Sequence, residues 1–155
     1  MGKHSFCIVD VFAEEKYAGN QLAVFTDAKD ISDTEMQQIA REINYSETTF
    51  ILSQEKRTGG YNVRIFTPEG ELPFAGHPTL GTAYVIQHEI IREPIETIIL
   101  NLKVGQIPVT LNYSGGQLDI LWMKQNAPSF DRVFDPEPIS QVLNLDKRDI
   151  DDRFP

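Results

Sequence analysis

Short apolar segments with turn residues between them dominate the chain. Residues 4–12, 22–25, 46–52 and 61–67 are rich in Val, Ile, Phe and Thr, and Gly or Asn residues interrupt the series. Segments of this kind predict β-strands. Three further segments follow Pro94, and in each of them apolar and polar residues alternate. This last group predicts an antiparallel meander with one face packed on a core.

Residues 31–44 carry a helical pattern instead of an alternating one. Four apolar residues recur at the spacing of one helix face: Met36, Ile39, Ala40 and Ile43. Ser32 and Glu35 have the spacing of a capping box at the start of this segment. The pattern predicts an amphipathic helix that packs one side on a larger body.

A second helical segment, from Pro78 to about His88, is apolar on most sides. A helix of this kind is buried. Gly81 lies inside it, where the missing side chain lets another backbone come close. Together the elements predict an α+β domain, in which a mostly antiparallel, barrel-like sheet is wrapped around one buried central helix.

The end of the chain changes character. Residues 131–138 are acidic and contain prolines, 139–145 have the composition of a short helix, and 146–155 are highly charged. We therefore expect one domain over residues 1–130 and a linker or crossing segment over 131–155.

Composition narrows the function classes. The 155 residues include 41% hydrophobic residues, which is ordinary for a folded core, and carry a formal net charge of −9. No basic run is visible, so nucleic acid is excluded as an expected partner. Cys7 is the single cysteine, so no disulfide forms within the chain. We expect a cytoplasmic protein, because neither an apolar run of membrane-spanning length nor a signal peptide pattern is present.

The stretch FTPEGELPFAGHPTLGTA, residues 66–83, leads into the buried helix. Pro78 suits the first helical position, and Gly76 lets the backbone approach a ligand. The N–H groups of Gly76, His77 and Thr79 then form a site for a carboxylate or phosphate at the helix N-terminus, at the floor of a cleft. The alternative is a plain junction between a loop and a helix, and the residues alone leave both open.

Glu47, in NYSETTF, is the second candidate for chemistry. It precedes the apolar residues Phe50, Ile51 and Leu52, and burial there would raise its pKa and suit it to general acid–base work. The alternative is a solvated strand-edge glutamate. Among the loop carboxylates, we expect Glu71 to brace its loop and Glu69 to be solvated. His, Cys and carboxylate residues show no metal-ligand spacing, so we expect no metal.

These motifs resemble those of the phenazine-biosynthesis PhzF-like family, which is related in fold to diaminopimelate epimerase. Three stretches carry the resemblance: FCIVDVFAEEKYAGNQLAVF, NYSETTF and RIFTPEGELPFAGHPTLGTA. Their order and spacing agree with the family, and the last pattern is quite specific. The resemblance covers essentially the whole chain and matches the N-terminal half of such proteins.

The resemblance implies a fold and an activity. Family members have two pseudo-symmetric halves, each a barrel-like sheet around a helix, with the active site between them. The phenazine enzyme is an isomerase that moves a proton on a small carboxylate substrate without cofactor or metal. Its proton-transferring residue corresponds to Glu47, and Gly76 and His77 correspond to residues that line its substrate site.

Two departures from the family pattern bear on these implications. Gly19-Asn20-Gln21 stands where the family usually has Gly-Asn-Pro. The chain also stops at Pro155, so the acidic and hydroxyl-bearing residues of a second half have no counterpart.

Two alternatives to the isomerase therefore stay open. One is a catalytically inactive half, truncated or paired with itself as a homodimer. The other is a hot-dog-type acyl thioesterase, which also wraps a sheet around a helix.

Overall fold

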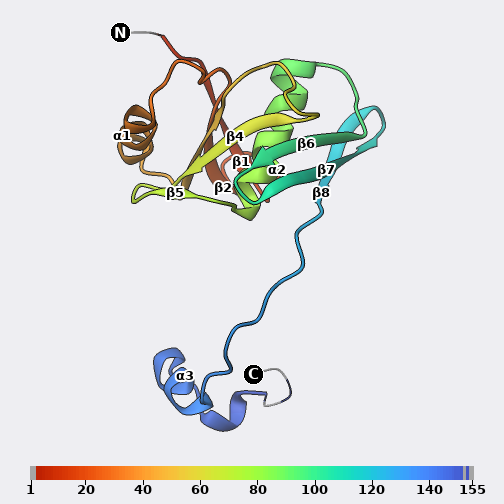
Figure 1. The fold of residues 1–155 in the computed structure, drawn as a ribbon. Coiled ribbons are helices and arrows are strands. Elements are labelled where there is room, and N and C mark those ends of the chain that lie inside the picture. The colour runs from red at the N-terminus through yellow and green to blue at the C-terminus, as the bar shows by residue number, and fades with distance from the viewer. Residues whose placement is uncertain (1–2, 152, 154–155) are drawn as a thin grey trace. The chain divides into compact units, whose positions relative to one another are not determined.

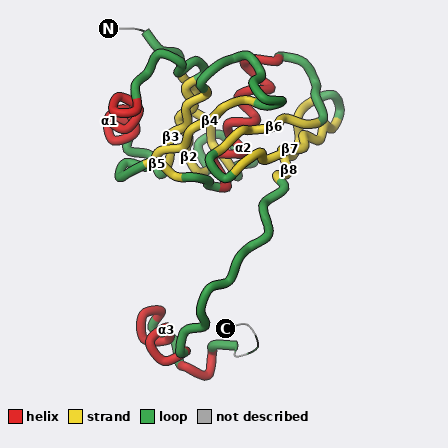
Figure 2. Tube along the Cα trace, viewed as in Figure 1, coloured by secondary structure: helices red, strands yellow, loops and turns green. Residues whose placement is uncertain are grey.

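A computed structural model describes residues 3–151 and 153. The chain forms two compact units, Met1–Gln125 and Asn126–Pro155, and each is described by itself. The first unit holds all the strands and both longer helices of the described residues (Figures 1 and 2).

One curled sheet forms the body of the first unit. Its strands lie in the order β1-β2-β3-β4-β6-β7-β8, and β5 pairs with the outer part of β4. The strands are β1 (Phe6–Val11), β2 (Asn20–Phe25), β3 (Glu47–Ile51), β4 (Tyr61–Phe66), β5 (Glu71–Leu72), β6 (Thr97–Leu102), β7 (Gly105–Ser114) and β8 (Gln117–Met123).

The sheet is mixed. The pairs β1–β2, β3–β4, β4–β5, β6–β7 and β7–β8 are antiparallel, whereas β2–β3 and β4–β6 are parallel. The meander predicted after Pro94 is confirmed as β6, β7 and β8. Parallel neighbours need a crossover connection. Helix α1 (Asp33–Ile43) lies in the first crossover, and α2 (Gly76–Val85) lies in the second.

Each face of the sheet has its own apolar cluster. The larger cluster joins α2, through Ala83 and Val85, to inward-facing residues of the strands, and the sheet forms a half-barrel against this helix (Figure 1). The smaller cluster lies under α1. There Phe25 stacks on Phe50 with ring centroids 4.9 Å apart, and Phe66 meets Phe50 edge-on at 5.5 Å.

Helix α1 confirms the predicted cap. The hydroxyl of Ser32 accepts a hydrogen bond from the Glu35 backbone N–H, and the Glu35 carboxylate accepts one from the Ser32 backbone N–H. Met36 and Ala40 are buried, as the apolar stripe predicts. Asn44 ends the helix in the left-handed conformation, with φ of 56°.

Helix α2 is buried, but it begins earlier than predicted. Its first residue is Gly76, so Pro78 is not at the first helical position. Pro78 is tolerated because its missing N–H belongs to the first turn, where N–H groups have no partner within the helix. Beyond Val85 the chain continues as a π-helix, Ile86–Ile91, which extends past His88.

Gly81 packs tightly, though against side chains rather than the backbone that we expected. A Cβ atom placed there would lie 2.7 Å from Leu22 Cδ2 and 2.7 Å from Val11 Cγ2. The absent side chain therefore lets β1 and β2 pack closely on α2.

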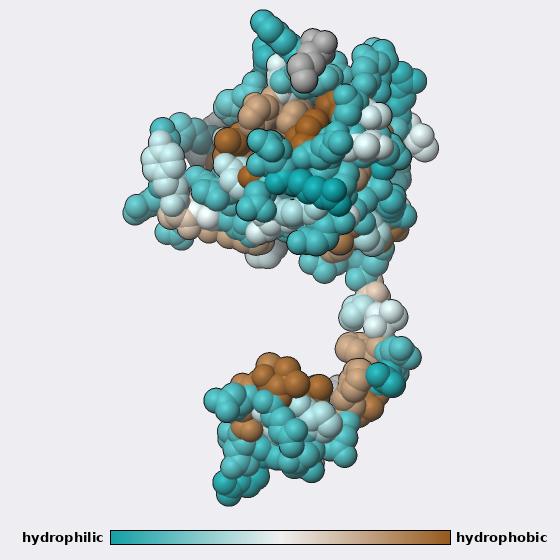
Figure 3. Space-filling model, turned by 90° about the vertical axis from the view of Figure 1, so that its left-hand side faces the viewer, coloured by the Kyte–Doolittle hydropathy of each residue, from teal (hydrophilic) through white to brown (hydrophobic). Residues whose placement is uncertain are grey.

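The second unit contains α3 (Pro136–Leu143) and a short 3-10 helix, Lys147–Asp149. Helix α3 starts before the predicted 139–145, because Asp135 caps it by accepting a hydrogen bond from the Glu137 N–H. Val142 and Leu143 are exposed, at 83% and 58%, and Figure 3 shows apolar surface on this unit. The assignment of residues 131–155 as a crossing segment stays a prediction.

Candidate functional site

Glu47 is the first residue of β3, an interior strand between β2 and β4. Its side chain is only 16% exposed, so it is not a solvated strand-edge residue. Side chains alternate along a strand, so Glu47 points to the same face as Thr49, whose hydroxyl is 2.8 Å from that of Thr82 on α2. The carboxylate therefore lies on the α2 side of the sheet.

His77 lies in the first turn of α2, and its side chain is 8% exposed. Its neighbour Gly76 opens the helix, and a Cβ atom there would lie 3.2 Å from Met123 Cε, at the end of β8. Ala75 is the N-cap and supplies no side-chain hydrogen bond. The first N–H groups of α2 thus have no capping side chain, and the positive end of the helix dipole lies beside them.

The structure brings Glu47 and His77 together from positions far apart in the sequence. Glu47 Oε2 is 3.2 Å from His77 Nδ1. The contact does not count as a hydrogen bond, and Glu47 Oε2 and His77 Nε2 are both buried without a hydrogen-bond partner in the described residues. Buried polar atoms in proteins are nearly always paired. Two unpaired polar atoms near a helix N-terminus make this region the candidate site for a polar ligand.

A buried pair of threonines links the strand that carries Glu47 to the helix that carries His77. The hydroxyls of Thr49 and Thr82 join β3 to α2, and both side chains are fully buried. Thr48 also has a buried hydroxyl without a partner in the described residues, but strand alternation turns it to the α1 face, away from Glu47. Sequence reasoning missed the threonine pair, although two threonines inside apolar segments were the visible signal.

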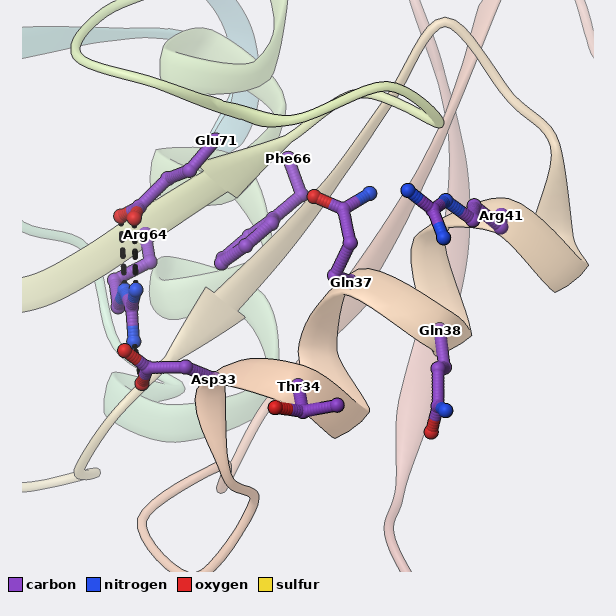
Figure 4. A pocket seen from close by; sticks show the side chains of 8 residues that line it. All are labelled: Asp33, Thr34, Gln37, Gln38, Arg41, Arg64, Phe66 and Glu71. Carbon is purple, nitrogen blue, oxygen red and sulfur yellow. Dashed lines mark hydrogen bonds and ion pairs between the residues drawn. The ribbon is translucent and has the colours of Figure 1, made fainter.

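A cluster of charged side chains lies where β4, β5 and the start of α1 meet. Glu71 accepts hydrogen bonds from Arg64, and these hold the pKa of its carboxyl below the ordinary value. The hydrogen bond from Lys103 also lowers this pKa, whereas burial of the carboxyl raises it. Glu71 thus braces its stretch, while Glu69 is exposed, as expected. A hollow of ≈ 400 Å³ lies here between α1 and β4 (Figure 4), and none of Glu47, Gly76 and His77 lines it.

The described residues hold no group of His, Cys, Asp and Glu that would suit a metal ion. No helix among residues 3–151 is long and apolar enough to cross a membrane.

His88, for which the sequence suggested no partner, bonds to Glu89 at 2.9 Å and stacks on Tyr84, though it is exposed.

The family model described as "phenazine biosynthesis-like protein" matches residues 9–151. The chain belongs to this family. Among curated PhzF-like proteins, a trans-2,3-dihydro-3-hydroxyanthranilate isomerase of Pseudomonas aeruginosa is 38% identical over 142 residues. That match covers 92% of this chain and 50% of the relative. The isomerase of the same name in Pseudomonas chlororaphis is 42% identical over 127 residues, covering 82% of this chain and 44% of the relative.

Solved structures agree with this assignment. A predicted epimerase from Pseudomonas aeruginosa superposes with a TM-score of 0.82 at 31% identity, covering 97% of this chain and 54% of that one. A PhzF-family protein of Bacillus anthracis gives a TM-score of 0.77 at 28% identity, covering 94% and 48%. The chain therefore spans about half the length of the PhzF-like proteins that it matches.

Proposed function

We propose that this chain supplies one side of the active site of a PhzF-type isomerase, which moves a proton on a small carboxylate substrate without a cofactor. The supporting observation is the buried contact of 3.2 Å between Glu47 Oε2 and His77 Nδ1 at the open N-terminus of α2. The names of the relatives, trans-2,3-dihydro-3-hydroxyanthranilate isomerase, support a cyclic, conjugated amino acid as substrate.

In this proposal Glu47 is the proton carrier. Its carboxylate takes a proton from a carbon of the substrate, and the C–H electron pair enters the conjugated system as the Glu47 O–H bond forms. The protonated Glu47, whose O–H exchanges with solvent water, then returns a proton to a carbon of the substrate, which restores the carboxylate. Proton transfer by a positioned side chain contributes about 10²–10⁴-fold to a rate.

The start of α2 holds the negative charge in this scheme. The N–H groups of Gly76 and His77 lie in the first helical turn, where a carboxylate or a developing anion is stabilised. His77 Nδ1 faces Glu47, which leaves the buried Nε2 to meet the substrate. A side chain at position 76 would narrow the entry to this turn, because its Cβ atom would lie 3.2 Å from Met123 Cε. Glycine at this position keeps the entry free.

Deuterium exchange tests the role of Glu47. The intact gene product is incubated in D₂O with trans-2,3-dihydro-3-hydroxyanthranilate, and NMR follows deuterium incorporation and product formation. We expect Glu47→Gln to lower the rate by about 10²-fold or more, because the amide cannot carry the proton. Glu69→Gln is the matched control, since that carboxylate is exposed in the same motif stretch. Unchanged exchange in Glu47→Gln would refute the proposed role.

The same samples address the alternative of an inactive, self-associating half. Sedimentation at the assay concentration gives the oligomeric state, which tests the predicted homodimer. A purified protein that exchanges no deuterium and forms a dimer favours the inactive, self-associating half.

A further inference from the structure

A group of charged side chains fixes the motif stretch shortly before it reaches α2. The Glu71 carboxylate accepts hydrogen bonds from Arg64 Nε at 2.8 Å and Arg64 Nη2 at 2.7 Å, one to each oxygen. Lys103 Nζ, from the turn between β6 and β7, lies 2.6 Å from Glu71 Oε2. Arg64 also bonds to Asp33, the first residue of α1 (Figure 4). We call these four residues the Glu71 clamp.

The turn before β5 is held as well. Gln37 Nε2, on α1, donates to the carbonyl oxygens of Thr67 at 2.9 Å and Pro68 at 3.1 Å. Arg41 Nε donates to the same Pro68 oxygen at 3.0 Å. The Thr67 hydroxyl donates to the Gly70 carbonyl within the turn. The path from β4 to β5 is therefore bonded to α1 on one side and to the clamp on the other.

The side chains that make these hydrogen bonds also line the hollow between α1 and β4. Its lining includes Gln37, Arg41, Arg64 and Glu71, and each of these polar side chains already has a partner within the protein. A ligand there would compete with existing hydrogen bonds. We call the Glu71 clamp, together with the hydrogen bonds from α1 to the turn before β5, the brace, and the hollow is the outer side of this brace.

The brace is needed because α2 does little to fix its own start. Ala75 offers no capping side chain, and among the described residues a side-chain hydrogen bond at the helix start runs from the Thr79 hydroxyl to the Ala75 carbonyl at 2.7 Å. Only Leu72 to Ala75 separate Glu71 from the helix. Farther along α2, Gly81 locks against Leu22, which holds the helix body but leaves its first turn to the flanking chain.

We propose that Glu71 is a positioning residue, which acts through β5 to hold His77 against Glu47. The inference rests on the proposed function of that pair. Arg64 supplies a planar, two-pronged contact that fixes direction as well as distance, and Lys103 adds a point charge from a third element. Displacing a reacting group by about 1 Å costs about 10²-fold in rate. Loosening the clamp therefore lowers turnover without touching the site.

The test compares Glu71→Gln with the matched control Glu69→Gln in the intact gene product. One readout is the NMR signal of the His77 imidazole, assigned by its loss in His77→Gln. The second readout is the rate of deuterium exchange, separated into kcat and KM, and the third is Tm. We expect Glu71→Gln to shift the His77 signal and to lower kcat about 10²-fold, with little change in KM. Glu69→Gln should match the wild type.

Arg64→Lys separates geometry from charge and also covers the case in which Glu71→Gln does not fold. It keeps the positive charge but cannot make the two-pronged contact, so it should shift the His77 signal in the same direction. If Glu71→Gln and Arg64→Lys lower only Tm and leave the His77 signal unchanged, the clamp is merely stabilising and the proposal is wrong. If the wild type exchanges no deuterium, the proposed function fails, while the His77 signal still decides the inference.

Discussion

Gly81→Ala gives a sharp test of how closely α2 packs on the sheet. The new Cβ atom would lie 2.7 Å from both Leu22 Cδ2 and Val11 Cγ2, which is closer than carbon atoms can approach. Leu22 is fully buried and Val11 is a stiff, β-branched residue, so neither has free space to move into. The packed sheet must therefore shift.

The magnitude follows from two opposing contributions to the free energy of unfolding. Replacing Gly by Ala inside a helix stabilises it by about 1 kcal/mol, whereas overpacking a core costs about 1–3 kcal/mol. The balance is a net loss of about 1 kcal/mol, which lowers Tm by roughly 4 °C in a domain of this size. Without the clash, the substitution would raise Tm by a similar amount, so the sign of the change decides the question.

Urea unfolding followed by circular dichroism measures this change. Gly70→Ala is the control, because a Cβ atom there meets nothing within 4 Å and we expect a change within about 0.5 kcal/mol. Leu22→Val should partly rescue Gly81→Ala, since it withdraws the carbon atom that clashes. A Gly81→Ala midpoint at or above that of the wild type, with an unchanged urea slope, would refute the packing argument.

Two further predictions concern polar groups that are buried or partly buried. Thr49→Val leaves the fully buried Thr82 hydroxyl without its partner at 2.8 Å, so we expect a loss of about 1–3 kcal/mol in urea unfolding. The double replacement of both threonines should cost less than twice that, and additive losses would contradict the pairing. Hydrogen bonds from Arg64, and after them from Lys103, lower the pKa of Glu71 in the folded state. The ionised carboxylate therefore stabilises the fold fully at any pH above the pKa of the unfolded chain, about 4.3. This stabilisation is lost as the pH falls through the lower pKa of the folded state. Tm measured from pH 7 to pH 3 should therefore fall more steeply for the wild type than for Glu71→Gln, and parallel curves would contradict this.

Local sequence patterns predicted most helices and strands, because the spacing of apolar residues within a segment reflects which of its own faces is buried. The apolar stripe and the capping pair Ser32 and Glu35 located α1 within two residues at its start. The apolar residues on most sides of α2 correctly predicted a buried helix, although Gly81 meets side chains and not the predicted backbone. The strand β5 was missed because its two residues, Glu71 and Leu72, are too few to form a pattern.

The parallel pairings and the site geometry were beyond local patterns. Alternation shows which face of a strand is buried, but it does not name the neighbouring strand, so the parallel joint of β2 to β3 was not predicted. The residues alone left Glu47 and His77 as separate candidates, each with a plain structural explanation. Their contact depends on the path of the chain from β3 to α2, which no spacing in the sequence encodes.

The two parallel joints divide the sheet into three blocks, each formed by antiparallel neighbours close in sequence: β1–β2, β3–β4–β5 and β6–β7–β8. Each block can form early, because its contacts are local. The joints close later, since each must first bring together chain ends separated by a helix. The joint between β4 and β6 has only two paired positions, and Asn101 reinforces it by donating to Asn62 Oδ1 at 2.8 Å. We therefore expect this short seam to form last on folding and to open first under stress.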